Sequence, residues 1–219
     1  MSHAPALSVA EGVTLIGGGE VGPQALAAAL ALAPVVAAAD SGADAALARG
    51  LVPRAVIGDL DSLSDEGRAR LAPVLHHVPE QDTTDFEKAL ARIAAPFVLA
   101  VGFAGSRLDH ALAALNILAR RVGPPTILLT EADAVLACPA RVTADLPPGT
   151  RLSLFPMGPA RAEAQGLRWP VEGIGFAPGG RIGTSNEITG PLRLAVKGQM
   201  LLILPLSELE TARTIARAA

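Results

Sequence analysis

The stretch that decides the fold is residues 12–50, GVTLIGGGEVGPQALAAALALAPVVAAADSGADAALARG. Apolar, strand-like runs alternate in it with alanine-rich, helix-like runs, in the order 12–19, 23–33, 34–40 and 42–50. Pro23 falls in the first turn of the first predicted helix, where proline is tolerated, and Gly50 falls where the second helix would end. The stretch therefore predicts two consecutive strand–helix units.

The same alternation continues to about residue 135. Further strands are predicted at 54–59, 96–103 and 125–130, and further helices at 84–94 and 107–121. Strands that alternate with helices favour a mostly parallel sheet covered by helices on both faces. We therefore assign residues 1–135 to an α/β domain.

The segment 136–219 has a different composition. It is rich in glycine and proline, with short strand candidates between predicted turns, and we predict that it forms an all-β sandwich domain. Within it, LRLAVKGQMLLILPL (192–206) is expected to form a hairpin that turns at Lys197 and Gly198. The predicted fold class is thus an N-terminal α/β domain followed by a C-terminal β-sandwich.

The overall composition excludes several classes of protein. Half of the 219 residues are hydrophobic and 18% are charged, which is typical of a globular protein. A formal net charge of −3, without any run of lysine or arginine, argues against binding to nucleic acid or to an anionic membrane. The single cysteine, Cys138, excludes an internal disulfide and fits a reducing cytoplasm. No secretory signal is evident, and Pro34 interrupts the apolar run before Asp40, so we expect a cytoplasmic protein without a membrane span.

Most of the aspartates follow the predicted strands. Eight of the ten lie between residues 40 and 109, and seven of these lie at or just beyond strand ends: Asp40, Asp44, Asp59, Asp61, Asp82, Asp85 and Asp109. In an open parallel sheet, the loops that follow the strands share one edge of the sheet, where ligands bind. Acids that are distant in the sequence are therefore expected to line one pocket.

Helix capping is the alternative explanation for some of these acids. A hydroxyl residue followed three positions later by an acid can satisfy the free amides of a helix start, as in Ser41–Asp44, Thr84–Glu87 and Ser106–Asp109. Capping does not explain Asp59 and Asp61, which stand two residues apart after one strand. Two carboxylates so close together repel each other unless a cation offsets their charge, which favours a ligand or metal site.

Mg²⁺ is the metal that this pattern favours, because it takes oxygen ligands and commonly bridges carboxylates to substrate phosphates. Zinc is disfavoured, since His76 and His77 are adjacent, which suits no usual chelating spacing, and His110 has no cysteine nearby. The two adjacent histidines are expected in a surface loop.

A glycine-rich turn follows the first predicted strand. Gly17, Gly18, Gly19 and Gly22 precede a helix, so bare amides and the positive end of that helix could hold a phosphate group. A tight strand–helix turn would have the same composition, and the spacing is not that of a dinucleotide-binding fingerprint. Both interpretations stay open at this point.

Four segments together resemble the thiamine pyrophosphokinase family. They are ADSGADAALARGLVPRAVIGDLDSLS (39–64), QDTTDFEKAL (81–90), GSRLDHALAALNIL (105–118) and SNEITG (185–190). The combination of GDLDS with RLDH at this spacing is specific, and the resemblance extends over about residues 13–205. The family pattern has Gly and Asn where this chain has Ser41 and Asp44, and a second Gly where it has Ser106.

This resemblance implies a fold, an activity and an assembly. It implies an α/β nucleotide-binding domain and a β-sandwich that work as a homodimer, with sites across the dimer interface and thiamine touching both domains. It also implies transfer of a pyrophosphoryl group from ATP to the hydroxyl of thiamine, which gives thiamine diphosphate and AMP. Mg²⁺ would be the cofactor.

With this family in view, each candidate residue receives a hypothetical role. Asp59, Asp61 and Asp85 would bind Mg²⁺ and, with Arg107, form the catalytic group. ATP would be contacted by Gly17, Gly18, Gly19, Asp40, Ser41, Gln81 and Thr84, and thiamine by Asp109, Ser185, Asn186 and Trp169. A general base is not evident, although Asp109 or Asp85 could serve, and Trp169 could pack within the protein instead of stacking on the substrate.

Three other functions fit parts of the same pattern. A related pyrophosphokinase that acts on a pterin alcohol would have a similar ATP half, although SNEITG in a β-rich domain favours thiamine. A nucleotide-binding regulatory module would hold ATP without turnover. A Mg²⁺-dependent phosphohydrolase could use Asp59 as a covalent nucleophile, but that chemistry requires neither a β-rich second domain nor a glycine-rich loop after the first strand.

Overall fold

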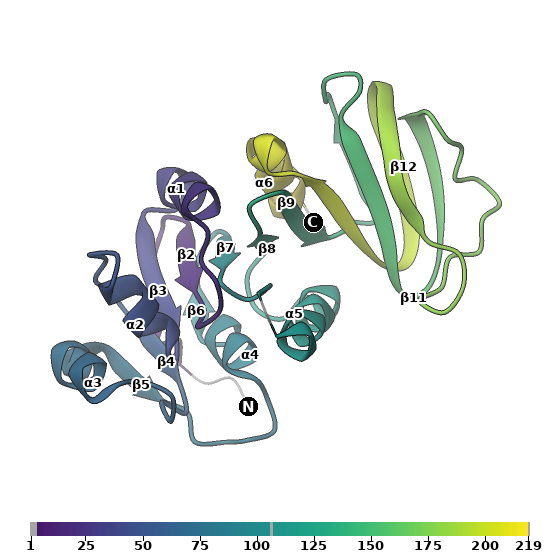
Figure 1. Cartoon of the computed structure of the whole chain (residues 1–219). Helices are drawn as coiled ribbons and strands as arrows, with labels where there is room; N and C mark the ends of the chain where they lie inside the picture. Colours follow the sequence, from purple (N-terminus) through teal and green to yellow (C-terminus); the bar gives the residue numbers. More distant parts are fainter. Residues whose placement is uncertain (1–3, 106, 219) are drawn as a thin grey trace. The chain divides into compact units, whose positions relative to one another are not determined.

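The computed structural model of the chain describes residues 4–105 and 107–218 (Figure 1). The chain divides into two compact units. The first comprises Met1–Ile117 and Arg121–Glu131, and the second comprises Leu118–Arg120 and Ala132–Ala219. Buried apolar side chains occur in both, so each unit has a core of its own.

The first unit is built on a parallel sheet. Its strands are β2 (Val13–Ile16), β3 (Val35–Ala39), β4 (Val56–Gly58), β5 (Leu75–His77), β7 (Val98–Val101) and β8 (Thr126–Leu129). They lie in the order β8-β7-β2-β3-β4-β5, and every neighbouring pair is parallel. β2, β3 and β7 are buried along their whole length, as expected of central strands that are covered on both faces.

Helices lie on both faces of this sheet. They are α1 (Pro23–Leu32), α2 (Gly42–Leu47), α3 (Asp65–Leu71), α4 (Asp85–Leu90) and α5 (Leu108–Arg120), with a short 3-10 helix, η1 (Ala72–Val74), after α3. Parallel strand–helix–strand connections are right-handed, so α1, α2 and α3, which lead from β2 towards β5, cover one face, and α4 and α5 cover the other (Figure 1). The predicted α/β fold class is confirmed.

The strand order changes direction at β2. From β2 the chain adds β3, β4 and β5 on one side, and it then returns to place β7 and β8 on the other side. The loops that follow β2 and β7 therefore leave neighbouring strands in opposite directions. Open α/β sheets bind their ligands at such a point, beyond the carboxyl ends of the strands.

Two segments of the first unit differ from the sequence-based expectations. Residues 65–77 form α3, η1 and β5, so His76 and His77 lie in an edge strand and not in a surface loop. The helix expected over 84–94 ends at Leu90, because β6 (Ile93–Ala94) pairs in parallel with β1 (Leu7–Ser8). This small second sheet depends on a contact between distant segments, which helical periodicity does not reveal.

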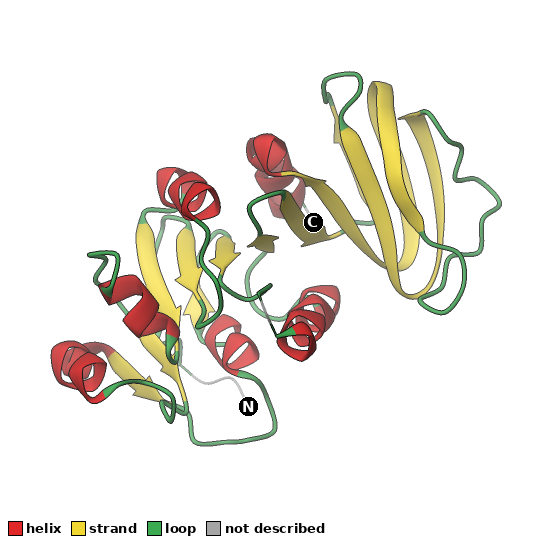
Figure 2. Cartoon of the chain, viewed as in Figure 1, coloured by secondary structure: helices red, strands yellow, loops and turns green. Residues whose placement is uncertain are grey.

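The second unit is β-rich, as predicted. It contains β9 (Asp133–Ala137), β10 (Arg141–Ala144), β11 (Arg151–Leu167) and β12 (Gly183–Pro205), followed by η2 (Leu206–Glu208) and α6 (Leu209–Arg217) (Figure 2). β12 pairs antiparallel with β9 and β10 and also pairs with β11. Helix α6 is an addition to the expected all-β arrangement. No helix in the described parts of the chain has both the length and the apolar composition needed to cross a membrane.

The predicted hairpin at Lys197 and Gly198 is wrong. The chain continues through both residues as part of β12, with Lys197 opposite Arg161 and Gly198 opposite Ala160 in the ladder with β11. Gly198 has a φ of +104°, and a Cβ atom there would lie 2.3 Å from the carbonyl oxygen of Pro159. The glycine thus permits a close approach of two strands, which has the same sequence signal as a turn.

Candidate active site

A cavity of about 510 Å³ opens in the first unit at the carboxyl ends of the parallel strands. Its walls come from the loops after β2, β3, β4 and β7 and from the starts of α4 and α5. These segments meet there because the strand order changes direction at β2. The cavity therefore collects side chains that are far apart in the sequence.

Three carboxylates converge at this cavity. Asp40 and Asp59 line it, Asp61 lies beside them, and one oxygen from each lies within 4.8 Å of the other two. Left-handed backbone conformations bring them together, since Asp40 has a φ of +44° and Leu60, between the other two acids, has a φ of +64°. Aspartate tolerates this region but leucine rarely adopts it, so the turn at Leu60 is a strained feature of the kind found at functional sites.

The carboxylate of Asp40 has the feature that most directly indicates a cation site. The residue is only 4% exposed, yet its Oδ1 has no hydrogen-bond partner among the described residues. Burial raises the pKa of Asp40, and the nearby charges of Asp85, Asp59 and Asp61 raise it further. A hard cation would supply the missing partner and offset the repulsion between the carboxylates. The residues present therefore fit a Mg²⁺ ion.

A buried lysine connects two of the acids. The side chain of Lys88, on α4, is 1% exposed, and its Nζ donates to Asp59 Oδ2 at 2.7 Å and to Asp85 Oδ1 at 3.2 Å. Asp85 Oδ1 also accepts from the backbone amide of Asp59 at 3.3 Å. Burial alone would lower the pKa of Lys88, but the bonds to the two acids raise it, and the Lys88 hydrogen bond lowers the pKa of Asp59. Lys88 and Asp59 are thereby held in their charged forms.

The start of α4 brings two further predicted residues to the cavity. Thr84 is the N-cap of this helix, where its Oγ1 accepts from the amide of Glu87 at 3.3 Å, so the predicted cap by the Thr84 hydroxyl is confirmed. Gln81 Nε2 donates to Asp59 Oδ2 at 3.2 Å. Both residues line the cavity, and a capping role therefore does not remove Thr84 from the candidate site.

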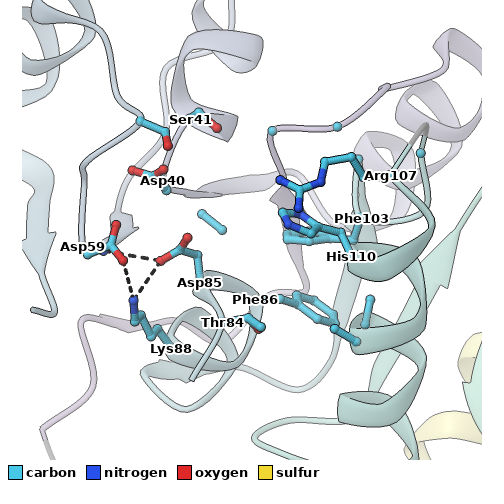
Figure 3. Close-up of a pocket in the computed structure, with 18 of the residues that line it drawn as sticks. Asp40, Ser41, Asp59, Thr84, Asp85, Phe86, Lys88, Phe103, Arg107 and His110 are labelled. Carbon is cyan, nitrogen blue, oxygen red and sulfur yellow. Dashed lines mark hydrogen bonds and ion pairs between the residues drawn. The ribbon is translucent and has the colours of Figure 1, made fainter. Parts of the chain in front are cut away.

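The other side of the cavity is basic and aromatic. Figure 3 shows Asp40, Asp59 and Asp85 on one side and Arg107 and His110 on the other. Phe86 and Phe103 also line the cavity, with ring centroids 4.2 Å apart. A polyphosphate fits such a space, because its charge can be balanced by a cation at the acids and by a guanidinium opposite them.

Asp109 is absent from the cavity wall as described. Its carboxylate is 66% exposed and pairs with Arg107, with Nε–Oδ1 and Nη2–Oδ2 distances of 3.2 and 2.6 Å. This pairing lowers the pKa of Asp109 and raises that of Arg107. Asp109 thus holds a residue that does line the cavity. Ser106, its suggested capping partner, lies outside the described residues.

The glycine turn favours the structural interpretation over the phosphate site. The amides of Gly17 and Gly19 donate to the carbonyl oxygens of Val101 and Gly102, so they are not bare, and Gly17 does not line the cavity. A Cβ atom at Gly17 would lie 2.6 Å from the Gly102 oxygen, so the turn needs glycine for a close backbone approach.

An amide at the start of α1 also has a hydrogen-bond partner. Glu131 Oε1 accepts from the amide of Ala25 at 2.9 Å, which places a carboxylate at the positive end of the helix. The amides of Gly17, Gly19 and Ala25 therefore already have partners, and the phosphate contact by this turn stays a prediction. Gly18 and Gly19 remain part of the cavity wall.

The capping interpretation is wrong for Ser41 and Asp44. Ser41 makes no side-chain cap, although it precedes α2 and lines the cavity. Asp44 instead accepts from Ser64, with its Oδ2 2.9 Å from the amide nitrogen and its Oδ1 2.6 Å from Oγ. Asp44 therefore ties α2 to the loop that carries Asp59 and Asp61.

The three residues predicted in the second unit form a cluster within that unit. Asn186 Nδ2 donates to the carbonyl oxygen of Trp169 at 2.8 Å, and its Oδ1 accepts from the amide of Trp169 at 3.1 Å. Ser185 has a φ of +59°, and its amide donates to Ser153 Oγ at 2.9 Å. The indole of Trp169 is half exposed, with the Arg168 guanidinium 5.1 Å from its ring centroid. Trp169 is thus not a core residue, and Asn186 holds its backbone.

The three clustered aspartates differ in one residue from the three predicted metal ligands. Asp40, predicted to contact the nucleotide, lies with Asp59 and Asp61, whereas Asp85 lies next to them and bonds Lys88. Lys88 and His110 had no predicted role in the cavity. For Lys88 a signal exists, because it follows Asp85 by three positions and so shares its helix face.

Comparison with known proteins identifies the family. The sequence matches "Thiamin pyrophosphokinase, catalytic domain" over residues 26–127 and "Thiamin pyrophosphokinase, vitamin B1 binding domain" over residues 141–200. Thiamine pyrophosphokinase 1 of Oryza sativa subsp. japonica is 27% identical over 156 residues, which cover 62% of this chain and 59% of the rice protein. Thiamine pyrophosphokinase of Bacillus subtilis is 34% identical over 90 residues, or 38% of this chain and 42% of that protein. The chain thus matches about half of the length of these curated relatives.

Solved structures share the fold. Thiamine pyrophosphokinase from Bacillus subtilis superposes with a TM-score of 0.70 at 19% identity and covers 89% of this chain and 98% of its own. Yeast thiamin pyrophosphokinase gives a TM-score of 0.71 at 17% identity and covers 91% and 88%. The two family matches together cover most of the sequence, and the chain therefore belongs to the thiamine pyrophosphokinase family.

Proposed function

We propose that the chain transfers the pyrophosphoryl group of ATP to the hydroxyl of thiamine and forms thiamine diphosphate and AMP. The main support is the buried, unpartnered Oδ1 of Asp40 among the described residues, in a carboxylate that clusters with Asp59 and Asp61. These acids border a cavity that also contains Arg107. Membership of the family supplies the substrate class.

The proposed cofactor is Mg²⁺, held by Asp59 and Asp61 together with Asp40. Bound there, the ion would offset the charge of the carboxylates and of the phosphate oxygens. Asp85 lines the same cavity, and its Oδ1 bonds Lys88 and the Asp59 amide. Asp85 therefore both supports Asp59 and remains a candidate ligand.

In the proposed reaction, the hydroxyl oxygen of thiamine forms a bond to the β-phosphorus of ATP. The bond from this phosphorus to the oxygen that bridges the α- and β-phosphates breaks, and AMP leaves with that oxygen. The hydroxyl proton passes to a base, for which Asp85, which lines the cavity, and Asp109 are the candidates. Positioning and charge neutralisation then provide most of the rate enhancement.

The nucleotide would be held by residues that line the cavity. Gly18, Ser41, Gln81 and Thr84 supply polar or close-approach contacts. Arg107 would stabilise the charge on the transferred group, since its planar guanidinium suits phosphate oxygens.

The acceptor would be recognised by Asp109 and by the cluster in the second unit. A carboxylate at Asp109 can accept from the amino group of the aminopyrimidine ring. The half-exposed indole of Trp169 offers a face on which an aromatic ring can stack. Ser185 precedes Asn186, whose side chain bonds the backbone of Trp169.

One incubation tests the proposal. The chain with ATP, Mg²⁺ and thiamine should form AMP and thiamine diphosphate in equal amounts, and EDTA should stop both, as followed by chromatography. Formation of ADP in place of AMP would contradict the proposal. Turnover with a pterin alcohol but not with thiamine would indicate the related pyrophosphokinase, and phosphate release without any acceptor would indicate a phosphohydrolase.

Asp109→Ala is expected to weaken thiamine binding by roughly tenfold, which corresponds to the loss of one hydrogen bond to a charged group. ATP binding should weaken less, because Arg107 keeps its own charge. Calorimetric titration with thiamine and with a non-hydrolysable ATP analogue measures both. Equal losses would show that Asp109 acts only through Arg107.

We also propose that the protein is a cytoplasmic homodimer. Support for the dimer comes from the family resemblance, and the buried thiol of Cys138 suits a reducing compartment. Light scattering on the purified chain gives the mass of the assembly directly.

A further inference from the structure

The turn between Asp59 and Asp61 poses a physical problem. In an extended chain, residues 59 and 61 would point to one face and residue 60 to the other. Here Leu60 is buried with Ala38, Val56 and Leu71, and it holds a φ of +64°. A left-handed conformation is unfavourable for a residue other than glycine. Contacts elsewhere must therefore hold this turn.

One peptide group lies at the centre of the turn. The amide of Asp61, which belongs to the peptide between Leu60 and Asp61, donates to Asp59 Oδ1 at 3.3 Å. The carbonyl oxygen of the same peptide accepts from Nη2 of Arg68. The orientation of this peptide therefore sets both the position of the Asp61 backbone and the orientation of the Asp59 carboxylate.

Arg68 comes from a helix that is itself anchored. It lies on α3, half-buried, and Ser64 caps that helix by accepting from the amide of Gly67 at 3.0 Å. Ser64 in turn donates twice to Asp44 on α2. The guanidinium of Arg68 is thus held by a fixed element at the point where the acidic turn needs support.

We propose that Arg68 is a positioning residue for the cation site, acting through the Leu60 carbonyl group to hold Asp59 and Asp61 in a metal-binding arrangement. The inference rests on the proposed function only for the identity of the metal. Loss of the bond would let the strained peptide rotate, and the two carboxylates would then have to be ordered by the cation itself. Partners that orient metal ligands typically contribute about 10- to 100-fold to metal affinity.

Arg68→Met and Arg70→Met form a matched pair for the test. Arg70 lies two positions later on α3 and is exposed, and its pairing with Glu66 at 3.3 Å should contribute little. Mn²⁺ binding, followed by the electron paramagnetic resonance signal of free Mn²⁺, should weaken about tenfold or more in Arg68→Met. It should be unchanged in Arg70→Met. The half-saturating Mg²⁺ concentration in turnover should rise in parallel, with little change in the KM for thiamine.

Two further variants complete the design. Arg68→Lys keeps the charge and a donor and should restore most of the Mn²⁺ affinity. Arg68→Gln, a milder change, replaces Arg68→Met if circular dichroism shows that the latter does not fold, with the same weakening expected. Equal Mn²⁺ binding by the Arg68 and Arg70 variants would overturn the inference. Because Mn²⁺ binding needs no substrate, a wild-type chain without turnover would refute the proposed function alone.

Discussion

Asp61→Asn is expected to lower the rate of AMP formation by about 100-fold or more at saturating Mg²⁺, as is typical when one preorganised electrostatic group is removed from an active site. Asn has almost the same shape, and Asp61 is an exposed residue whose carboxylate accepts from Ser62 Oγ at 2.9 Å. The fold should therefore be unaffected. Steady-state kinetics across a range of Mg²⁺ concentrations provides the measurement.

Asp65→Asn is the control for this variant. Asp65 is also an exposed aspartate, but it lies in the first turn of α3 and does not line the cavity. It should keep turnover within about twofold of the wild type, since only a helix-end interaction of a few tenths of a kcal/mol is lost. Near-normal turnover by Asp61→Asn would remove Asp61 from the metal site.

Lys88→Met is expected to lower both stability and activity. Methionine fills a similar volume, but it leaves Asp59 and Asp85 without their common partner, at side-chain exposures of 12% and 34%. Removing one member of a buried ion pair costs on the order of 3 kcal/mol. The melting temperature should then fall by roughly 10 °C. Turnover should fall as well, because Asp59 would no longer be held.

The chain offers a single matched control, because its other lysine is Lys197. Lys197 is exposed on β12, so Lys197→Met should leave the melting temperature and the rate nearly unchanged. Calorimetric melting with and without Mg²⁺ compares the two variants. If both melt alike, the buried ion pair contributes no net stability, and the structural role given to Lys88 is incorrect.

The parallel sheet could be predicted because its signal is local and repeated. Buried strands such as Val35–Ala39 are continuous apolar runs, and β2, β3 and β7 are each followed by a helix. Helix α6 also carried a local signal, since its buried residues Leu209, Ala212, Ile215 and Ala216 recur at helical spacing. The pairing of β6 with β1 carried no local signal, because it joins segments that are far apart in the sequence.

The acids of the site could be predicted as a group but not as an arrangement. Asp59 and Asp61 attract notice because two like charges need a reason to be adjacent. The inclusion of Asp40 depends on its left-handed backbone and on burial, and neither can be read from an aspartate at a strand end. In the same way, the carboxylate of Glu131 at the start of α1 comes from 106 positions away, so this contact could not be foreseen from the sequence.

Diffraction from crystals grown with Mn²⁺ and a non-hydrolysable ATP analogue tests most directly whether a divalent ion and a polyphosphate share this cavity. The anomalous signal should place Mn²⁺ at coordination distance from carboxylate oxygens of Asp40, Asp59 and Asp61, with the phosphates between the ion and Arg107. A Mn²⁺ peak elsewhere, with these three carboxylates making no contact to ion or nucleotide, would contradict the assignment of the site.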